Sequence, residues 1–232
     1  MIVFTHIPKT AGSTFTARIA SAIPGGEHFI VTADRGDDGG LAQRGTAGLS
    51  LVGGHIRFPA AWPVIGPATY VAAVRRPLDR LLSHFFFAIR QGEFAPRGSD
   101  LRAEFDRFYE IVRQQRWLNL QCRFFATEGR FDRAAEVIER HYAAVWDTAE
   151  TDRHFAAILD LCGLNAAPAA APPDAYVAPM AASDDEFRAG ARPRAYSGFL
   201  RADQAERVLD ENAEDARLHA WVAENAGIRR RT

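Results

Sequence analysis

The sequence predicts an α/β protein with a central parallel β-sheet flanked by helices and a helical C-terminal half. Two observations predict this class. Short apolar, partly β-branched runs alternate with helical patterns at the start of the chain, and the later part of the 232 residues is mainly helical in its periodicity. Strands that alternate with helices imply parallel pairing through right-handed crossovers. We therefore expect one α/β domain over residues 1–232.

Five segments have the length and composition of strands. The expected strands are residues 2–7, 28–33, 49–56, 69–74 and a short final strand at 144–146. A proline-containing loop at about 59–67 joins the third and fourth. Residues 34–40 have the composition of a surface loop, and their aspartates do not match the spacing of a calcium loop.

Helical patterns fill most of the remaining sequence. Ser13 and Thr14 suit the N-terminus of the first helix, and Leu78, Leu81 and Phe85 recur at helical spacing after Pro77. The other elements that we expect are helices at 13–22, 101–115, 117–127, 130–143, 152–162 and 201–224, with an extended Ala/Pro-rich connector at 166–173.

Composition excludes several classes of protein. The net charge is −1, from 28 basic and 29 acidic residues, so overall charge does not favour a nucleic-acid protein. The apolar content, 47%, excludes a wholly disordered chain. Lys9 is the single lysine, so the other 27 basic residues are arginines. This Arg/Ala-rich composition is typical of a high-GC bacterium.

Cysteine usage and hydropathy indicate the compartment. Cys122 and Cys162 are too few and too far apart for a disulfide framework or a zinc site, and we expect two buried thiols. The first residues lack the pattern of a signal peptide, and no window approaches the roughly 18 apolar residues of a membrane span. We therefore expect a cytoplasmic protein without a transmembrane segment.

The strongest motif is Phe4-Thr5-His6-Ile7-Pro8-Lys9-Thr10-Ala11-Gly12-Ser13-Thr14. A strand enters a tight loop that opens a helix, so backbone N–H groups and the helix dipole point at one spot and favour an anion such as phosphate. Lys9 adds a mobile positive charge. The pattern of P-loop NTPases does not fit, because here the lysine precedes the only glycine of the loop.

Two further strand ends carry polar side chains. Arg75 lies at the expected carboxyl end of a strand, where open α/β sheets bind ligands, and Ser83 lies about two turns into the next helix. A guanidinium suits phosphate because its fork donates paired hydrogen bonds, although a surface arginine and a helix serine are the plainer alternative. His55 ends the third strand and could accept a proton from a hydroxyl. The alternative is a structural histidine, which we favour for His6.

Four segments resemble sulfotransferases that use 3′-phosphoadenosine-5′-phosphosulfate (PAPS). Residues 8–14 resemble their 5′-phosphosulfate loop and residues 74–87 their 3′-phosphate motif, in the form of the carbohydrate (heparan and uronyl) 2-O-sulfotransferases. Gly53-Gly54-His55 is similar to the His-Gly-His segment that carries the base of that branch, and residues 119–122 also resemble the branch. The resemblance covers residues 2–127 and implies a P-loop-like sulfotransferase fold. The donor-binding residues that it implies are Lys9, Thr10, Ala11, Gly12, Ser13, Thr14, Arg75 and Ser83.

The resemblance also implies a mechanism. His55 would take the proton of an acceptor hydroxyl, and Lys9 would stabilise charge on the leaving 5′-phosphate, so both are catalytic. We expect PAPS as donor, 3′-phosphoadenosine-5′-phosphate (PAP) as product and no metal, because no Asp/Glu pair suggests a divalent-ion site. Gly53 departs from the first histidine of the family, and Arg76 from an acidic residue. Arg80 is expected to be structural.

The later sequence is harder to interpret. By analogy with related sulfotransferases, a loop at 174–197 could cover the donor, with Ser183 and Arg188 as binding candidates, although a plain surface loop fits equally well. Phe124 and Phe125 could flank an adenine, but core positions fit better. Arg57 and His84 could contact an anionic sugar.

The function that we expect is sulfation of a hydroxyl, with a carbohydrate as the acceptor. The alternatives are a sulfotransferase for a lipid or small-metabolite alcohol, and a nucleotide-binding module without catalysis, which only Gly53 favours. A nucleotide kinase is disfavoured, because the P-loop NTPase pattern is missing. We expect no nucleic-acid partner.

Overall fold

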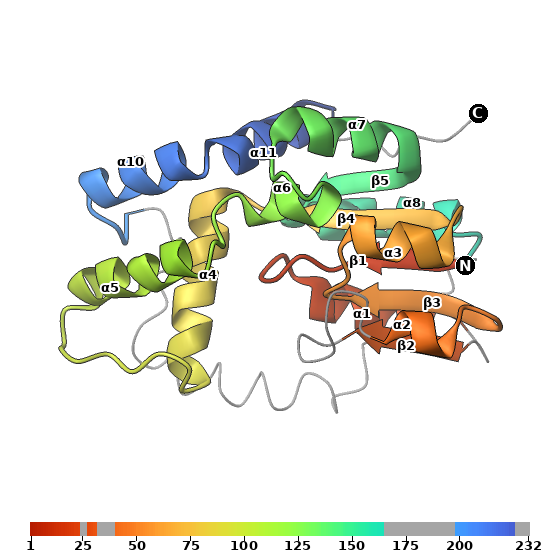
Figure 1. The fold of residues 1–232 in the computed structure, drawn as a ribbon, viewed down its shortest axis with the longest axis horizontal. Helices are drawn as coiled ribbons and strands as arrows, with labels where there is room; N and C mark the ends of the chain where they lie inside the picture. Colours follow the sequence, from red (N-terminus) through yellow and green to blue (C-terminus); the bar gives the residue numbers. More distant parts are fainter. Residues whose placement is uncertain (24–26, 32–39, 165–197, 226–232) are drawn as a thin grey trace.

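The computed structural model contains a five-stranded, all-parallel sheet flanked by helices, which confirms the predicted fold class (Figure 1). It describes residues 1–23, 27–31, 40–164 and 198–225, without the side chains of Ser13, Thr14 and Val31. The strands are β1 (Ile2–Thr5), β2 (Glu27–Val31), β3 (Leu49–Gly54), β4 (Thr69–Val74) and β5 (Tyr142–Asp147).

The strand order, β2-β3-β1-β4-β5, determines where a ligand can bind. From β1 the chain runs to β2 at one edge of the sheet, whereas from β4 it runs to β5 at the other edge. Connections that leave neighbouring strands in opposite directions open a crevice at their carboxyl ends. Because all strands are parallel, Thr5, Gly54, Val74 and Asp147 end at the same side of the sheet.

The helices enclose the sheet and extend beyond its carboxyl edge (Figure 1). They are α1 (Gly12–Ser21), α2 (Leu41–Arg44), α3 (Phe58–Ile65), α4 (Pro77–Arg90), α5 (Leu101–Gln114), α6 (Leu120–Phe125), α7 (Phe131–His141), the 3₁₀ turn η2 (Thr148–Glu150), α8 (Thr151–Leu161), α10 (Ala202–Glu211) and α11 (Ala213–Asn225).

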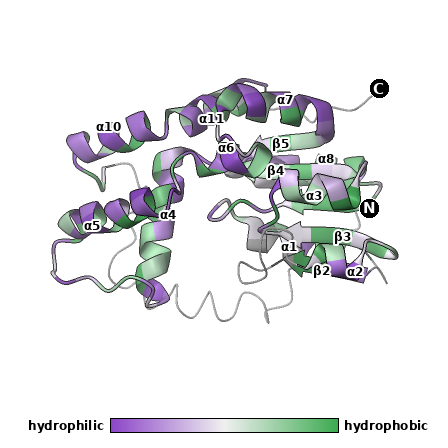
Figure 2. Ribbon diagram, viewed as in Figure 1, coloured by the Kyte–Doolittle hydropathy of each residue, from purple (hydrophilic) through white to green (hydrophobic). Residues whose placement is uncertain are grey.

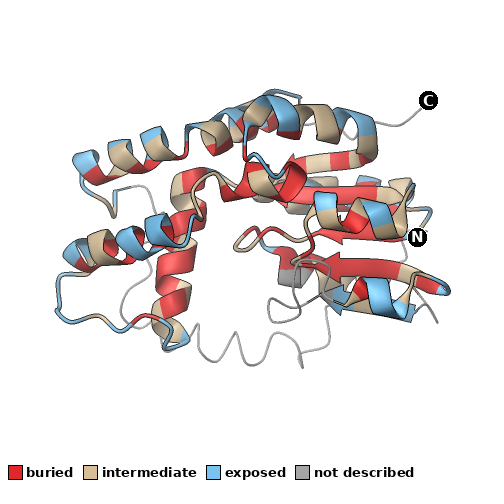
Figure 3. Ribbon diagram, in the orientation of Figure 1, coloured by how far each residue is buried: buried red, intermediate tan, exposed pale blue. Residues whose placement is uncertain are grey.

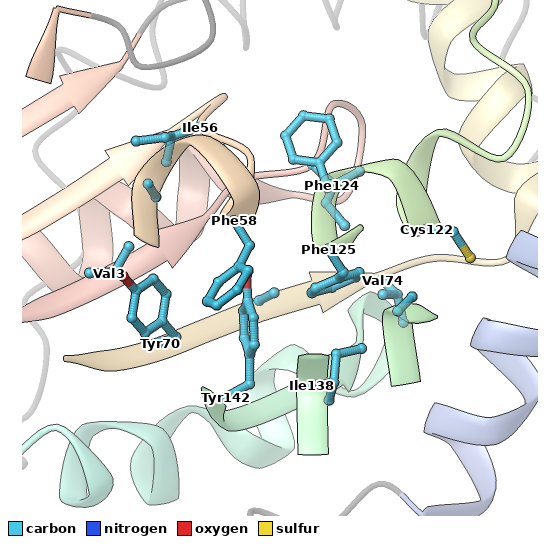
Figure 4. Close-up of a cluster of buried hydrophobic side chains, with 14 of the residues drawn as sticks. Val3, Ile56, Phe58, Tyr70, Val74, Cys122, Phe124, Phe125, Ile138 and Tyr142 are labelled. Atoms are coloured by element: carbon cyan, nitrogen blue, oxygen red, sulfur yellow. The ribbon is translucent and has the colours of Figure 1, made fainter. Parts of the chain in front are cut away.

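Alternate residues of each strand face two separate cores, because successive side chains of a β-strand point to opposite faces of the sheet. Val3 and Tyr70 pack with α3, α6, α7 and α11 on one face of the sheet, and Figure 4 shows the ring of Tyr70 beside those of Phe58 and Tyr142. Phe4 and Val71 pack with α1 and α8 on the other face. A third apolar cluster joins α4, α5 and α10 beyond the carboxyl edge of the sheet. This cluster holds α4 against the mouth of the crevice.

The distribution of hydropathy and burial agrees with this layering. Hydrophilic residues predominate along the outer helix α10 (Figure 2). Buried residues fill most of α4 and the central strands (Figure 3). Helix α4 is therefore a largely buried helix and not a surface helix.

Two sequence predictions about elements were wrong. Residues 58–65 form α3 and not a loop, since Pro59 occupies a first-turn position where no helical N–H is needed, and the helix continues past Pro63. The predicted helix 201–224 is divided into α10 and α11 at Asn212. The buried amide of Asn212 donates to Tyr109 Oη (3.1 Å) and accepts from Asn119 N–H (3.1 Å), which fixes the break.

Candidate functional site

The loop after β1 is compact and held by its own bonds. Lys9 and Ala11 both adopt left-handed backbone conformations, with φ of 70° and 56°. Between them, buried Thr10 folds back on the strand end: its hydroxyl donates to the carbonyl of Ile7 (2.8 Å) and its N–H to the same oxygen (3.3 Å). The predicted role of Thr10 as an N–H donor to the ligand therefore needs correction, because Thr10 instead shapes the loop.

Helix α1 begins at Gly12, one residue earlier than the sequence predicts. Neither Ala11 nor Gly12 donates its N–H to a backbone carbonyl of the described residues. The first N–H groups of a helix have no intrahelical partner and lie at its positive end, which suits an anion. The side chains of Ser13 and Thr14 lie outside the described part of the structure.

Gly12 is required by the packing of His6. A Cβ built on Gly12 would lie 1.9 Å from His6 Cδ2, so any larger residue would displace the ring. The imidazole of His6 stacks near Phe4, with ring centres 5.9 Å apart. Burial, with the charges of His55 and Lys9, lowers its pKa to about 3. His6 is thus a neutral, packed histidine, as its predicted structural role requires.

Lys9 reaches across the crevice to α4. Its Nζ lies 3.9 Å from the ring centre of Phe87, a cation–π contact. Ser83 and Phe87 are four residues apart on α4 and therefore share one face of the helix. Half-buried Ser83, which the sequence predicts to bind the donor with Arg75, therefore lies on the face of α4 that Lys9 contacts, one turn nearer the end of β4.

Arg75 joins the loop to the next strand end. Its Nη1 donates to the carbonyl of Lys9 (3.1 Å), across 66 residues of sequence. Its backbone N–H and C=O are both bonded by the side chain of Gln121, at 2.8 Å each. Two predicted phosphate-binding segments therefore meet at the carboxyl edge of the sheet.

A cleft of about 440 Å³ opens beside this junction. Pockets for small molecules commonly have about 300–1,000 Å³. It is lined by Ala11, Arg75, Arg76, Asp79, Asp147, Thr148, Ala149 and His219. A second cavity, of about 20 Å³ between α7, β5 and α11, has room for little more than a water molecule.

Two pairs of polar side chains line the cleft. Asp147 at the end of β5 contacts His219 of α11, with 2.8 Å between Oδ2 and Nε2. Burial opposes the charge of Asp147, but the hydrogen bonds from His219 and from the Ala149 N–H outweigh it and lower its pKa. Arg76 and Asp79 form the second pair (2.9 Å), and Arg76 is exposed. The cleft therefore presents charges of both signs.

His55 lies on the opposite side of the loop, just past β3. It is half-buried, and its ring centre lies 4.7 Å from that of His6. Burial, followed by the charge of Lys9, lowers its pKa below 6.5. No described residue forms a hydrogen bond with its imidazole. A neutral imidazole at neutral pH is competent to accept a proton.

Gly53 stands where the sulfotransferases that the sequence resembles have a histidine. A Cβ at this position would lie 3.3 Å from Thr16 Cγ2 of α1 and 3.5 Å from Ile30 Cδ1 of β2. A histidine here would point at Thr16 and Ile30, which fill the space beside Gly53. His55 thus stands without a second histidine at position 53.

Several other predicted residues lie away from the crevice. His84 is buried between Phe108 and Trp117, at ring distances of 5.3 and 5.0 Å, and burial, with Arg80 and Lys9, lowers its pKa to about 3. Its predicted contact with an anionic sugar is therefore wrong. Phe124 and Phe125 are buried in the core, as favoured from the sequence (Figure 4).

The remaining predictions have mixed outcomes. Cys122 is buried as predicted, but Cys162 is only half-buried. Arg57 precedes α3 and its guanidinium lies 5.8 Å from the Phe124 ring centre. Ser183, Arg188 and the segments 166–173 and 174–197 lie outside the described residues.

Sequence reasoning missed four residues of this site. The sequence does not point to Asp147 or His219, and Phe87 and Gln121 enter only as members of segments 74–87 and 119–122. For Phe87 the sequence does contain a signal, because three phenylalanines in a row cannot all lie on one face of a helix. Phe85 and Phe86 fill the apolar face of α4 and are 0% and 4% exposed, so the ring of Phe87 points to a different side of the helix. Asp147 follows a strand end, but His219 approaches it from 72 residues away and no pattern links the two.

The described residues contain neither a candidate metal site nor a candidate membrane span. No group of three or more His, Cys, Asp or Glu side chains there could hold a metal ion. No helix in the described ranges is both long and apolar enough to cross a bilayer. Comparisons with known proteins found no matching family model and no matching curated protein.

Proposed function

We propose that this chain is a PAPS-dependent sulfotransferase that sulfates a hydroxyl group. The observation that supports it most is the hydrogen bond between Arg75 Nη1 and the Lys9 carbonyl (3.1 Å). It joins the two segments that resemble the 5′-phosphosulfate loop and the 3′-phosphate motif. A donor with phosphate groups at both ends of its ribose needs cations at two nearby points, and Lys9 and Arg75 provide them.

The sheet order supports the same fold proposal. A phosphate loop after the central strand of a β2-β3-β1-β4-β5 parallel sheet fits a P-loop-like sulfotransferase arrangement. We assign the 5′-phosphosulfate to the N–H groups that begin α1, and the 3′-phosphate to Arg75 and Ser83. The cleft of about 440 Å³ between Arg75 and Asp147 is the space for the nucleoside.

The residues of the crevice have complementary roles in this reaction. PAPS supplies a sulfuryl group linked to its 5′-phosphate. His55 accepts the proton of the acceptor hydroxyl as the new oxygen–sulfur bond forms. The bond between sulfur and the bridging oxygen breaks, and PAP leaves with that oxygen. Lys9 stabilises the negative charge that grows there. The lowered pKa of His55 keeps its imidazole unprotonated and ready for this step.

We assign the acceptor to the β3 side of the loop. Arg75 and the cleft lie on the β4–β5 side of the loop, whereas His55 follows β3 on the other side. A carbohydrate hydroxyl is the acceptor that the resemblance favours, and a lipid or small-metabolite alcohol is the alternative within the same reaction.

A second candidate function is a nucleotide-binding module that does not catalyse transfer. The position of Gly53 favours it, because Thr16 and Ile30 occupy the space that the family's first histidine would need. Under this candidate the donor site would be retained while acceptor chemistry was lost.

Two measurements test these candidates in sequence. Isothermal calorimetry compares PAP with ATP, and we expect PAP to bind more tightly because Arg75 and Ser83 recognise its 3′-phosphate. Tight binding of ATP without binding of PAP would overturn the sulfotransferase proposal. Transfer of labelled sulfate to a panel of sugars, lipids and small alcohols then separates the enzyme from the module. Binding of PAP with no transfer to any acceptor favours the module.

A further inference from the structure

The side chain of Gln121 extends the hydrogen bonding of β4 past its last residue. Strand β4 ends at Val74, and Arg75 follows it. Gln121 Oε1 accepts from the Arg75 N–H and Gln121 Nε2 donates to the Arg75 C=O, each at 2.8 Å. Gln121 is 0% exposed. The carboxamide thus forms the two bonds that a neighbouring strand would form, and it fixes the backbone from which the Arg75 side chain projects.

Helix α11 holds Gln121 in turn. The carboxylate of Asp215 accepts from the Gln121 N–H (3.0 Å) and from the Cys122 N–H (2.8 Å). The Asp215 N–H donates to Asn119 Oδ1 (3.1 Å). These three bonds tie the start of α6 to α11, so Gln121 has little freedom to move away from Arg75.

A buried charge reinforces this anchor. Arg80 of α4 is fully buried, and none of its guanidinium nitrogens forms a hydrogen bond with the described residues. An isolated buried cation is very costly unless an opposite charge lies near. Asp215 of α11 attracts this guanidinium electrostatically, although burial is the larger effect on both groups and lowers the pKa of Arg80 and raises the pKa of Asp215. The attraction between Arg80 and Asp215 therefore adds to the hydrogen bonds between α6 and α11 that hold Gln121.

We infer that Gln121 is a positioning residue for the anion-binding guanidinium of Arg75. This inference rests on the proposed function, in which that anion is the 3′-phosphate of the donor. With its backbone fixed by Gln121 and its Nη1 bonded to the Lys9 carbonyl, Arg75 keeps one orientation before the donor arrives. Such preorganisation spares the cost of ordering the side chain on binding.

The test compares two ligands that differ only in the 3′-phosphate. Calorimetry measures the affinity of PAP and of adenosine 5′-phosphate for the wild type, Gln121→Met and Gln121→Glu. We expect Gln121→Met to lower the affinity for PAP about tenfold, because the charge-assisted contact between Arg75 and the 3′-phosphate is lost or misaligned. The affinity for adenosine 5′-phosphate should change less than about twofold. Gln121→Glu keeps the shape and an acceptor for the Arg75 N–H but replaces the donor to the Arg75 C=O with a carboxylate oxygen, so we expect a loss at least as large. It also serves if Gln121→Met does not fold.

The matched control is Gln204, another fully buried glutamine that binds backbone groups. Its Nε2 donates to the Arg102 carbonyl (2.8 Å) and its Oε1 accepts from the Arg201 N–H (3.0 Å), away from the crevice. Gln204→Met is expected to leave the preference for PAP unchanged. Gln121→Met added to Arg75→Ala is expected to cost no further PAP affinity, because the side chain that it positions is gone.

Hydrogen exchange tests the inference without any nucleotide. We expect the Arg75 amide to exchange at least about tenfold faster in Gln121→Met than in the wild type or Gln204→Met, because one bond protects it. An unchanged exchange rate, or an unchanged PAP preference in both Gln121 variants, overturns the positioning role. Failure of the wild type to bind PAP overturns the proposed function instead, and the exchange rate then still decides whether Gln121 holds Arg75.

Discussion

The two sides of the phosphate loop are held by different kinds of interaction. On the Arg75 side, directional hydrogen bonds join Arg75 to Gln121 and to the Lys9 carbonyl. On the His55 side, packed rings predominate. The ring centres of His55 and His6 lie 4.7 Å apart, and the His6 ring fills the space beside Gly12. The first arrangement fixes a charge in one orientation, and the second half-buries an imidazole whose nitrogens form no hydrogen bond with the described part of the chain.

This difference fits the two tasks of the proposed reaction. A group that binds phosphate must present its donors in a fixed geometry before the ligand arrives. A general base must instead exchange a proton with the acceptor, and a hydrogen bond to another protein group would compete with that exchange. The comparison predicts that substitutions on the two sides affect different measurable quantities.

Lys9 stands between the two sides, and its substitution is expected to have the largest effect. Lys9→Ala removes the mobile cation over Phe87 and should lower sulfate transfer by about 10²–10³-fold, as loss of one preorganised donor typically does. The measurement is turnover with saturating PAPS and acceptor. Arg18→Ala is the control, because Arg18 also lies over an aromatic ring, Phe155, at 3.7 Å but belongs to the last turn of α1. Equal losses in both variants would contradict the role of Lys9.

Substitution of His55 should separate the two sides most clearly. His55→Ala is expected to lower kcat by about 10²–10³-fold and to leave the affinity for PAP unchanged, because the imidazole contacts no part of the nucleotide in our assignment. Arg75→Ala should instead lower the affinity for PAP. Calorimetry and steady-state kinetics measure the two effects, with exposed His28 on β2 as the control for a histidine substitution. Near-normal turnover of His55→Ala at saturation would rule out His55 as the base.

Gly12 tests the ring packing of the His55 side. Gly12→Ala would place a Cβ 1.9 Å from His6 Cδ2, so the ring must move, and we expect the free energy of unfolding to fall by about 1–3 kcal/mol. Gly53→Ala should cost less, because its nearest contact is 3.3 Å, to Thr16 Cγ2. Urea unfolding measures both.

A double variant isolates the clash at Gly12. In a His6→Ala background, Gly12→Ala should lower the free energy of unfolding by less than about 0.5 kcal/mol, since the obstructing ring is absent. The same loss in both backgrounds would mean that His6 is not what excludes a larger residue at position 12.

Local sequence patterns were sufficient to predict the sheet and the loop. The strand at 69–74 has the predicted bounds, because Pro67 precedes it and an apolar run fills it. The loop after β1 was predicted because its lysine, glycine and hydroxyl residues are contiguous. Residues 58–65 were mistaken for a loop because their prolines outweighed the apolar face that Phe58 and Ala61 bury.

Contacts between distant segments could not be predicted in the same way. Gln121 meets Arg75 across 46 residues, and Asp215 meets Gln121 across 94. No periodicity relates such positions, because their proximity depends on how α6 and α11 pack on the finished sheet. Gly53 illustrates the same limit, since its missing side chain was visible in the sequence but the neighbours that fill the space were not.

The smallest expected effect concerns the protonation of His55. Burial is the larger cause of its lowered pKa and the charge of Lys9 the second, so removing that charge should raise the pKa only part of the way towards 6.5. An NMR titration of the imidazole protons in the wild type, Lys9→Gln and the remote Arg18→Gln measures this, with no change expected in Arg18→Gln. Because the wild-type pKa is lowered, His55 is neutral above it, and the acidic limb of the kcat profile should fall below pH 6.5. A pKa in Lys9→Gln equal to that of the wild type would show that the loop cation does not act on the base, and the two sides of the loop would then be electrostatically independent.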